Sequence, residues 1–208
     1  MLSVENILLF ASAGILLNLT PGPDMIYTAT RSASQGRNAG IVSALGIGTG
    51  TIFHILAAAF GLSAILMYSA TAYEFIKWIG AAYLVYLGIK SILDRNKNFD
   101  SQNIIKDSLK KIYTQGVVTN VLNPKVALFF LAFLPQFIDV SSGNVTLQIL
   151  LLGFIFNTTG TIINSLVAVF FGKIGGLLNR SPKIKKIQSW FTGTVYIGLG
   201  VSLALSKK

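Results

Sequence analysis

The chain has 208 residues, of which 52% are hydrophobic and only 12% are charged, and its mean hydropathy is +0.66. Soluble domains carry about 25% charged residues, so this composition argues against a soluble enzyme and against a nucleic-acid-binding module. The chain has no cysteine, which excludes disulfide exchange, thiolate metal ligation and iron–sulfur chemistry.

Six apolar stretches follow one another along the chain. A helix needs about 20 mostly apolar residues to cross a bilayer. We expect transmembrane helices at about 4–27, 39–67, 72–93, 112–138, 146–172 and 187–206. The longest hydrophilic stretch, 94–111, is too short to fold alone. The sequence therefore predicts a single all-α integral membrane domain over 1–208, with the lipid bilayer as a partner and no nucleic acid.

Helix-breaking motifs interrupt the first and the fourth of these stretches. The first motif reads NLTPGPD over 18–24, and the second reads NVLNPK over 120–125. In a bilayer, a broken helix persists only where protein or a water-filled cavity receives the freed backbone groups. Two breaks at corresponding positions of two halves indicate a transport site. The predicted hinge residues are Pro21, Gly22, Pro23 and Pro124.

The second half of the chain repeats features of the first half. The block TGTI at 49–52 recurs at 159–162, and Trp78–Tyr83 has a counterpart in Trp190–Tyr196. The predicted units are repeat 1 at about 1–93, a loop at about 94–111 and repeat 2 at about 112–208. Because each copy has an odd number of spans, the second must enter the membrane from the opposite side. The expected fold is six transmembrane helices in a 3+3 inverted repeat, with discontinuous helices 1 and 4.

The net charge of +10 comes from an excess of basic residues. Their distribution along the chain indicates the membrane topology. With six spans, the loops after spans 1, 3 and 5 share one side of the membrane. That side holds 13 of the 17 basic residues: Arg31, Arg37, Lys90, Arg95, Lys97, Lys106, Lys110, Lys111, Lys173, Arg180, Lys183, Lys185 and Lys186. The positive-inside rule places it in the cytoplasm and both termini outside. If a broken segment re-enters instead of crossing, the termini lie on opposite sides.

Two residues of opposite charge follow the helix-breaking prolines, Asp24 in one half and Lys125 in the other. A charge at the bilayer centre costs roughly 2.5–3.5 kcal/mol, so both are candidates for substrate binding or proton coupling. A carboxylate is favoured at the start of a half-helix and a cation is not. Lys125 is therefore expected to have a partner, either Asp24 or a substrate carboxylate. The structural alternative is that Asp24 caps a helix and Lys125 snorkels to the membrane surface.

Further polar side chains flank the breaks. Asn18, Asn120 and Asn123 have amides that either stabilise the kinks or contact a substrate. His54, the single histidine, is a candidate proton carrier, with a packing role as the alternative, and Asn164 occupies the equivalent place in the second half. One histidine with few carboxylates does not make a metal site, so we expect neither a metal nor a cofactor.

Four motifs occur in order along the chain. They are Pro21-Gly22-Pro23-Asp24-Met25, Gly36-Arg37-x2-Gly40 leading into Gly46-x3-Gly50-x3-His54, Gly80-Ala81-Ala82-Tyr83-Leu84-x2-Leu87-Gly88, and Asn123-Pro124-Lys125-x3-Phe129-Phe130-x3-Leu134-Pro135-Gln136-Phe137. Together they resemble the LysE/RhtB family of bacterial amino-acid exporters. The resemblance implies a secondary active exporter of homoserine, homoserine lactone, threonine or similar small amino acids across the cytoplasmic (inner) membrane, by proton antiport. Small-residue seams also permit a homodimer.

Other function classes remain as alternatives. An inorganic cation or metal exporter on a related inverted-repeat scaffold needs several intramembrane carboxylates, histidines or cysteines. An intramembrane protease needs a paired nucleophile and base, or a metal triad. One histidine and one aspartate in different spans form neither of these catalytic groups, so we do not expect an enzyme. A passive channel is the third alternative.

Overall fold

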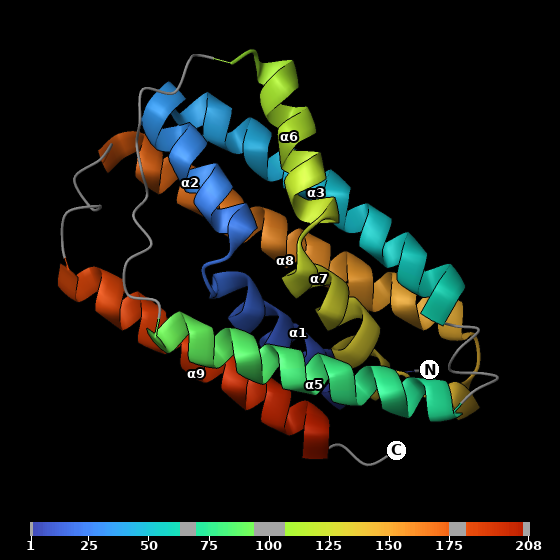
Figure 1. Ribbon diagram of the computed structural model, residues 1–208. Coiled ribbons are helices and arrows are strands. Elements are labelled where there is room, and N and C mark those ends of the chain that lie inside the picture. The colour runs from blue at the N-terminus through green and yellow to red at the C-terminus, as the bar shows by residue number, and fades with distance from the viewer. Residues whose placement is uncertain (1, 63–69, 94–106, 175–181, 206–208) are drawn as a thin grey trace.

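The computed structural model describes residues 2–62, 70–93, 107–174 and 182–205, and within these ranges every regular element is a helix (Figure 1). The predicted all-α fold is confirmed for this part of the chain. The uninterrupted helices are α3 (Arg37–Ala57), which continues as the π-helix η1 (Ala58–Leu62), α5 (Ala70–Leu93), α8 (Val145–Ile174) and α9 (Pro182–Leu205).

Two further segments are bent pairs of helices. Helix α1 (Val4–Leu19) meets α2 (Pro23–Gln35) at 50°, and α6 (Leu109–Val121) meets the segment Pro124–Phe137 at 43°. That segment consists of α7 (Pro124–Leu128), the π-helix η2 (Phe129–Phe133) and the 3₁₀-helix η3 (Leu134–Phe137), and the short η4 (Val140–Ser142) follows it. Both interruptions lie at the prolines, which lack the N–H that an unbroken helix requires.

Among the described residues, three helical segments are long and apolar enough to cross a membrane, and the number rises to five if each bent pair counts as one span. Within the part of the chain that the structure describes, the apolar portion of α9, Gly193–Leu205, is shorter than the helices that meet this criterion. The span expected at 187–206 is therefore not established by length and composition.

The first bent segment extends further than its apolar run predicts. The expected span stops at residue 27, but α2 continues to Gln35. Thr28, Arg31 and Ser32 in this extension are buried in the protein. Polar side chains that pack against other helices do not face lipid, so the end of the apolar stretch does not mark the end of the helix.

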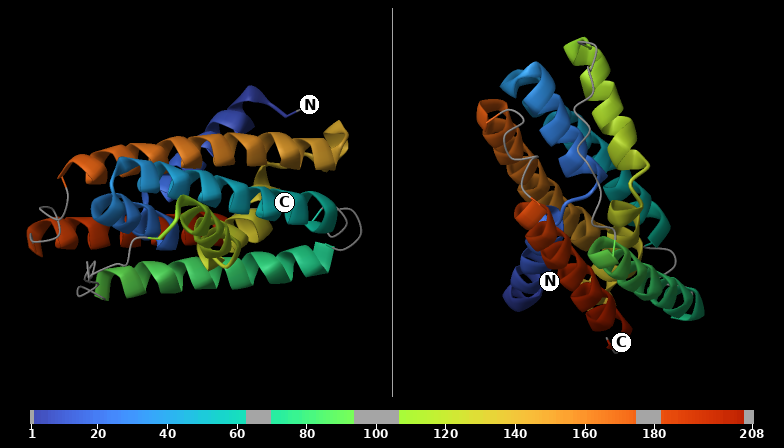
Figure 2. Two further views of the ribbon diagram at one scale, coloured as in Figure 1. Left: turned by 90° about the horizontal axis from the view of Figure 1, so that it is seen from above. Right: turned by 60° about the vertical axis from the view of Figure 1, so that its left-hand side comes forward.

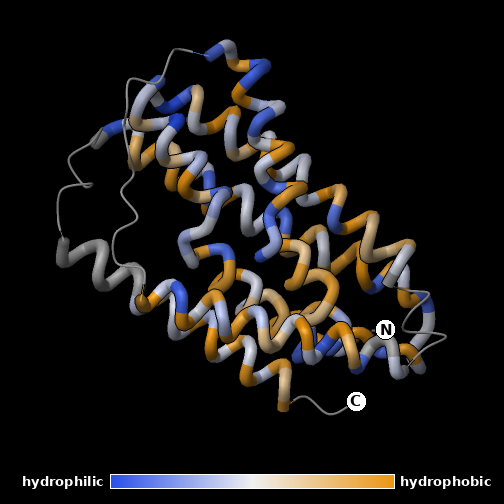
Figure 3. Tube along the Cα trace, in the orientation of Figure 1, coloured by the Kyte–Doolittle hydropathy of each residue, from blue (hydrophilic) through white to orange (hydrophobic). Residues whose placement is uncertain are grey.

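The helices form two groups. Helices α5 and α9 pack along each other, and α2, α3, α6 and α8 form the second group (Figures 1 and 2). The ends of α2, α5 and α8 lie at one end of the molecule, and the start of α1 and the end of α9 lie toward the other. Hydrophilic residues concentrate on α2 and the first turns of α6 (Figure 3).

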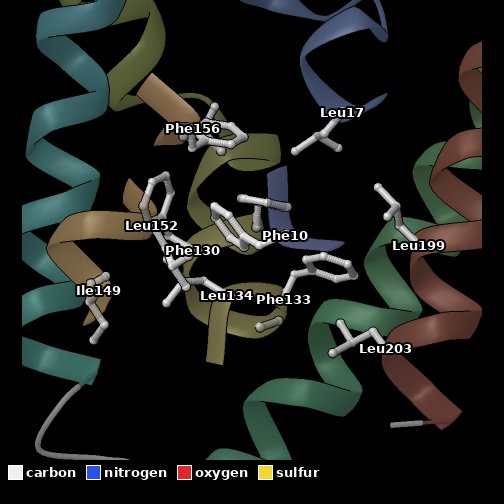
Figure 4. Close-up of a cluster of buried hydrophobic side chains, with 14 of the residues drawn as sticks. Phe10, Leu17, Phe130, Phe133, Leu134, Ile149, Leu152, Phe156, Leu199 and Leu203 are labelled. Carbon is white, nitrogen blue, oxygen red and sulfur yellow. The ribbon is translucent and has the colours of Figure 1, made fainter. Parts of the chain in front are cut away.

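An aromatic cluster fills the core between these groups (Figure 4). Phe129 of η2 stacks on Phe156 of α8 with ring centroids 4.6 Å apart, and it also contacts Phe133 at 5.2 Å and Phe10 at 5.5 Å. Aromatic pairs at such separations contribute about 0.5–1.5 kcal/mol each beyond area burial. The cluster therefore fixes α7 and η2, which follow the second break, against α1 and α8.

Asparagines of the two breaks dock on glycines of the opposite half. A Cβ atom added at Gly50 in α3 would lie 2.7 Å from the Cβ of Asn120, and one added at Gly160 in α8 would lie 3.1 Å from Oδ1 of Asn18. Each glycine belongs to one copy of the TGTI block. The same kind of contact thus joins each half to the break in the other half.

Candidate functional site

The first break leaves one backbone carbonyl for a partner from the other half of the chain. Thr20 closes α1 with its N–H and hydroxyl, and the hydroxyl donates to the carbonyl oxygen of Leu17 at 2.6 Å. Pro21 then prevents continuation of the helix. The Thr20 carbonyl oxygen accepts a hydrogen bond from Nζ of Lys125 at 2.9 Å. The lysine of the second break therefore satisfies a backbone group of the first.

Gly22 lies directly beside the Lys125 side chain. A Cβ atom at position 22 would lie 3.3 Å from Cδ and 3.5 Å from Nζ of Lys125. Lys125 is 7% exposed, so its ammonium group reaches into the protein and not to the surface. The snorkelling alternative does not describe this side chain.

The second break is held by Asn123 and His54. Oδ1 of Asn123 accepts from the backbone N–H of Lys125 at 3.0 Å and caps α7. Nε2 of His54 lies 2.9 Å from the carbonyl oxygen of Asn120. Because a carbonyl oxygen only accepts, Nε2 is the donor of this hydrogen bond.

Asp24 contacts the second break through the side-chain amide of Asn120. Nδ2 of Asn120 donates to Oδ2 of Asp24 at 2.9 Å. The Asn123 amide and the Lys125 charge are also near this carboxylate. However, Oδ1 of Asp24 and Nδ2 of Asn123 are buried with no hydrogen-bond partner in the described part of the chain.

A direct Asp24–Lys125 ion pair, one of the two partners considered for Lys125, is not among the ion pairs of the described residues. Each charged group is held instead by a neutral group of the opposite break: Asp24 by the Asn120 amide and Lys125 by the Thr20 carbonyl. Lys125 bonds to the Thr20 carbonyl because the helix break frees this buried group, and a buried carbonyl without a partner costs free energy. The site thus combines an acid and a base that are close but not neutralised by contact.

Two predicted residues lie outside this cluster of contacts. Asn18 donates to the carbonyl oxygen of Phe156 at 3.3 Å and to the Thr159 hydroxyl at 3.4 Å, so it ties the first break to α8. Asn164 is 6% exposed and donates to the carbonyl oxygen of Gly160 in its own helix at 3.0 Å. Its Oδ1 is buried without a partner among the described residues.

The structure adds residues that the sequence reasoning missed. The hydroxyl of Thr51 lies 3.3 Å from Oδ1 of Asn120. Tyr196 is 5% exposed, and its hydroxyl lies beside Thr20 and 3.9 Å from the position of a Cβ at Gly22. Both residues belong to the repeated blocks, so the repeat itself was the available signal.

A second polar cluster joins α2 to the start of α6, away from the breaks. Nη2 of Arg31 lies 2.7 Å from Oδ2 of Asp107 and 2.7 Å from Oε1 of Gln115, and its guanidinium group lies over the ring of Tyr27. The Tyr27 hydroxyl donates to the carbonyl oxygen of Ile112 at 2.7 Å, and Nζ of Lys111 lies 2.6 Å from Asp107. These contacts hold the two half-helices side by side.

Asp107 makes this cluster sensitive to acid. Hydrogen bonds from Lys111 and then Arg31 hold the pKa of Asp107 below its usual value. A lowered pKa in the folded state stabilises the fold above the usual value of about 4, and this contribution is lost as the pH falls through the folded pKa. Asp107→Asn should therefore unfold at a lower temperature than the wild type at pH 7, and the difference should shrink progressively as the pH falls below about 4. Thermal unfolding in detergent across this range checks the prediction, and a difference that is constant with pH would contradict it.

Within the described ranges, no group of three or more His, Cys, Asp or Glu side chains is placed to hold a metal ion. The polar atoms at the breaks are amides, one carboxylate, one ammonium group and backbone carbonyls. This set suits a small polar ligand that carries both a positive and a negative group.

Comparison with known proteins gives a consistent result. An uncharacterized membrane protein of Bacillus subtilis is 29% identical over 98% of this chain and 100% of its own length, and one of Vibrio cholerae is 30% identical over 96% and 97%. The homoserine/homoserine lactone efflux protein of Salmonella typhimurium is 28% identical over 92% of each chain. No solved structure matches the chain. The family model described as LysE type translocator matches residues 15–207, and this chain therefore belongs to the LysE type translocator family.

Proposed function

We propose that this protein is a secondary active exporter of small amino acids or their derivatives, which it binds where the two helix breaks meet. The observation that carries the proposal is the pair of buried atoms without partners between the breaks, the acceptor Oδ1 of Asp24 and the donor Nδ2 of Asn123. A zwitterionic amino acid brings one donor, its ammonium group, and one acceptor, its carboxylate. Its two ends complement these two atoms.

Opposite charges beside these atoms support the same orientation. The substrate ammonium group binds Asp24, and the substrate carboxylate takes the place of the Thr20 carbonyl as the partner of Lys125. In a site shielded from water, opposite charges attract each other more strongly than they do in bulk water. When the substrate binds, Lys125 exchanges a neutral partner for an opposite charge, and Asp24 gains an opposite charge at its unpartnered Oδ1.

Alternating access follows from the proposed inverted repeat. We assign α1 to α5 to the first copy and α6 to α9 to the second, with α9 as the sixth span. The reciprocal docking of Asn120 on Gly50 and of Asn18 on Gly160 supports a pseudo-two-fold relation between the copies. Such an arrangement can present one central site to either side of the membrane.

The proposed orientation places the ends of α2, α5 and α8 in the cytoplasm. Figure 2 shows these ends together, and they carry or adjoin Arg31, Lys90 and Lys173. The positive-inside rule assigns such a side to the cytoplasm. In this orientation the protein lies in the bacterial cytoplasmic membrane, and both termini are on the outer side.

Proton antiport is the proposed source of energy. A zwitterion carries no net charge, so the membrane potential alone does not drive its export. Asp24 is the proposed proton acceptor, and each proton that moves inward contributes about 2.3 kcal/mol per 100 mV. Nδ1 of His54 is the second candidate, since Nε2 is engaged by the Asn120 carbonyl.

Proteoliposomes test this function. Two relatives are named homoserine/homoserine lactone efflux proteins, so the first substrates are L-homoserine and L-threonine, with L-lysine as the comparison. Vesicles preloaded with unlabelled L-homoserine should transiently accumulate labelled L-homoserine above its equilibrium level. An imposed pH gradient should drive further net movement. Equilibration without an overshoot for every amino acid would indicate a channel, and no uptake at all would refute the proposal.

A further inference from the structure

Helix α2 carries a row of buried polar atoms that have no partner in the described part of the chain. Within the described ranges such atoms are Asp24 Oδ1, Thr28 Oγ1, Arg31 Nη1, Gln35 Nε2, Asn123 Nδ2 and Asn164 Oδ1. Four of these six belong to α2. Buried polar groups in native structures are almost always hydrogen-bonded, so four exceptions on one helix of 13 residues require an explanation.

The four residues lie on one face of the helix. Asp24, Thr28, Arg31 and Gln35 are spaced by four, three and four residues, and at about 3.6 residues per turn this spacing forms a single stripe. With a rise of about 1.5 Å per residue, the stripe is about 16 Å long. That is about half the thickness of the hydrocarbon core, which is near 30 Å.

Helix α6, together with Asp107 just before it, covers part of this stripe with polar groups. Asn120 bonds to Asp24 at the end near the breaks, and Asp107 and Gln115 bond to Arg31 at the other end. The contact between the two half-helices is therefore a polar seam at both ends. A polar seam is much less costly to open to water than an apolar one, because its groups regain hydrogen bonds in water.

We propose that the seam between α2 and α6 is the cytoplasmic access route to the site at the helix breaks, and that this structure shows the route closed. The inference rests on the proposed function, which supplies the substrate. The order of the groups suits a zwitterionic amino acid. The donors Arg31 and Gln35 lie at the cytoplasmic end and contact its carboxylate as it enters, and the acceptor Asp24 lies at the inner end and binds its ammonium group after it has moved along the seam.

The charge of the outer end agrees with this order. Arg31 and Lys111 share the single carboxylate of Asp107, so the three side chains leave one positive charge at the mouth of the seam. When the half-helices separate, the Arg31–Asp107 and Arg31–Gln115 contacts break. The unpartnered atoms of the stripe then gain partners from water or from the substrate.

The absence of cysteine from this chain allows a direct test with single-cysteine variants. Thr28→Cys is compared with Ala29→Cys, because Thr28 and Ala29 are 0% and 1% exposed, respectively, but Ala29 lies about 100° around the helix from the stripe. A membrane-impermeant maleimide is applied to the cytoplasmic face of membrane vesicles. Thr28→Cys should react at least about tenfold faster than Ala29→Cys, since a thiol that stays buried remains protonated and inert. Added L-threonine should slow the reaction of Thr28→Cys.

A second pair keeps the test valid if Thr28→Cys does not fold. Gln35→Cys lies on the stripe, and the neighbouring Ser34→Cys is exposed and off it. Both should react, but L-threonine should protect only Gln35→Cys. Equal rates for Thr28→Cys and Ala29→Cys, or equal protection of the second pair, would overturn the access route. Wild-type counterflow is measured in parallel, so that a transporter with a different route is distinguished from a protein that carries no amino acid.

Discussion

Replacement of Asp24 by asparagine should abolish proton-coupled transport while the protein still inserts and folds. Asparagine has nearly the same size and keeps an oxygen for the Asn120 amide, which bonds to Asp24 at 2.9 Å. It carries no charge for the substrate ammonium group and accepts no proton. Removal of one partner of a buried charge pair costs about 2–5 kcal/mol, which corresponds to about 30- to 4,000-fold in affinity. Uptake driven by a pH gradient in proteoliposomes measures the effect.

Asp139 supplies a matched control for this substitution. It caps η4 through its carboxylate, which accepts from the Ser141 backbone N–H at 2.9 Å and from the Ser141 hydroxyl at 2.6 Å, and these contacts lie away from both breaks. Asp139→Asn should therefore transport at close to the wild-type rate. If Asp24→Asn retains transport driven by the pH gradient, Asp24 has no part in coupling.

A single methyl group at Gly46 should strongly destabilise the fold. A Cβ atom at this position would lie 2.3 Å from the carbonyl oxygen of Tyr113 and 3.3 Å from Cα of Gly116, so α3 and α6 would have to separate. Backbone atoms cannot rotate away as a flexible side chain does. Overpacking of this kind typically costs about 1–3 kcal/mol, and the thermal unfolding temperature of Gly46→Ala in detergent should fall accordingly.

Gly198→Ala is the control for the packing argument. Gly198 lies in α9, where an added Cβ would meet no atom within 4 Å. Alanine is favoured over glycine inside a helix by about 0.5–1 kcal/mol, so this variant should unfold at the same temperature as the wild type or slightly higher. Equal behaviour of the two alanine variants would mean that α3 and α6 are not in close contact at Gly46.

Covalent chemistry explains why the helix breaks were predictable from the sequence. Proline has no N–H and a fixed φ, and this holds wherever the chain folds. The motifs at Pro21 and Pro124 therefore predicted two interruptions, and α1 ends at Leu19 while α7 begins at Pro124. The apolar stretches likewise predicted the helical membrane fold, because the transfer of a long run of side chains into lipid depends mainly on composition.

The length of α2, in contrast, was not predictable from the sequence. The hydropathy of the sequence falls after residue 27, and an apolar run cannot show that the following polar side chains are buried. Their burial depends on contacts with distant helices, as in the Ser32 hydroxyl, which donates to the carbonyl oxygen of Ala168 in α8. Three of the four stripe residues of the proposed access route, Thr28, Arg31 and Gln35, lie in this unpredicted extension.

By itself, the sequence determined the membrane environment, the places where helices stop, and which polar residues border the stops. Only the tertiary structure decided which of these residues are partners. Asp24 was one of the two partners considered for Lys125, and in the structure Lys125 bonds to the carbonyl of Thr20, 105 residues away. The reason is that a broken helix frees backbone groups whose positions depend on how the two halves pack, and each buried group takes the nearest donor or acceptor that this packing supplies.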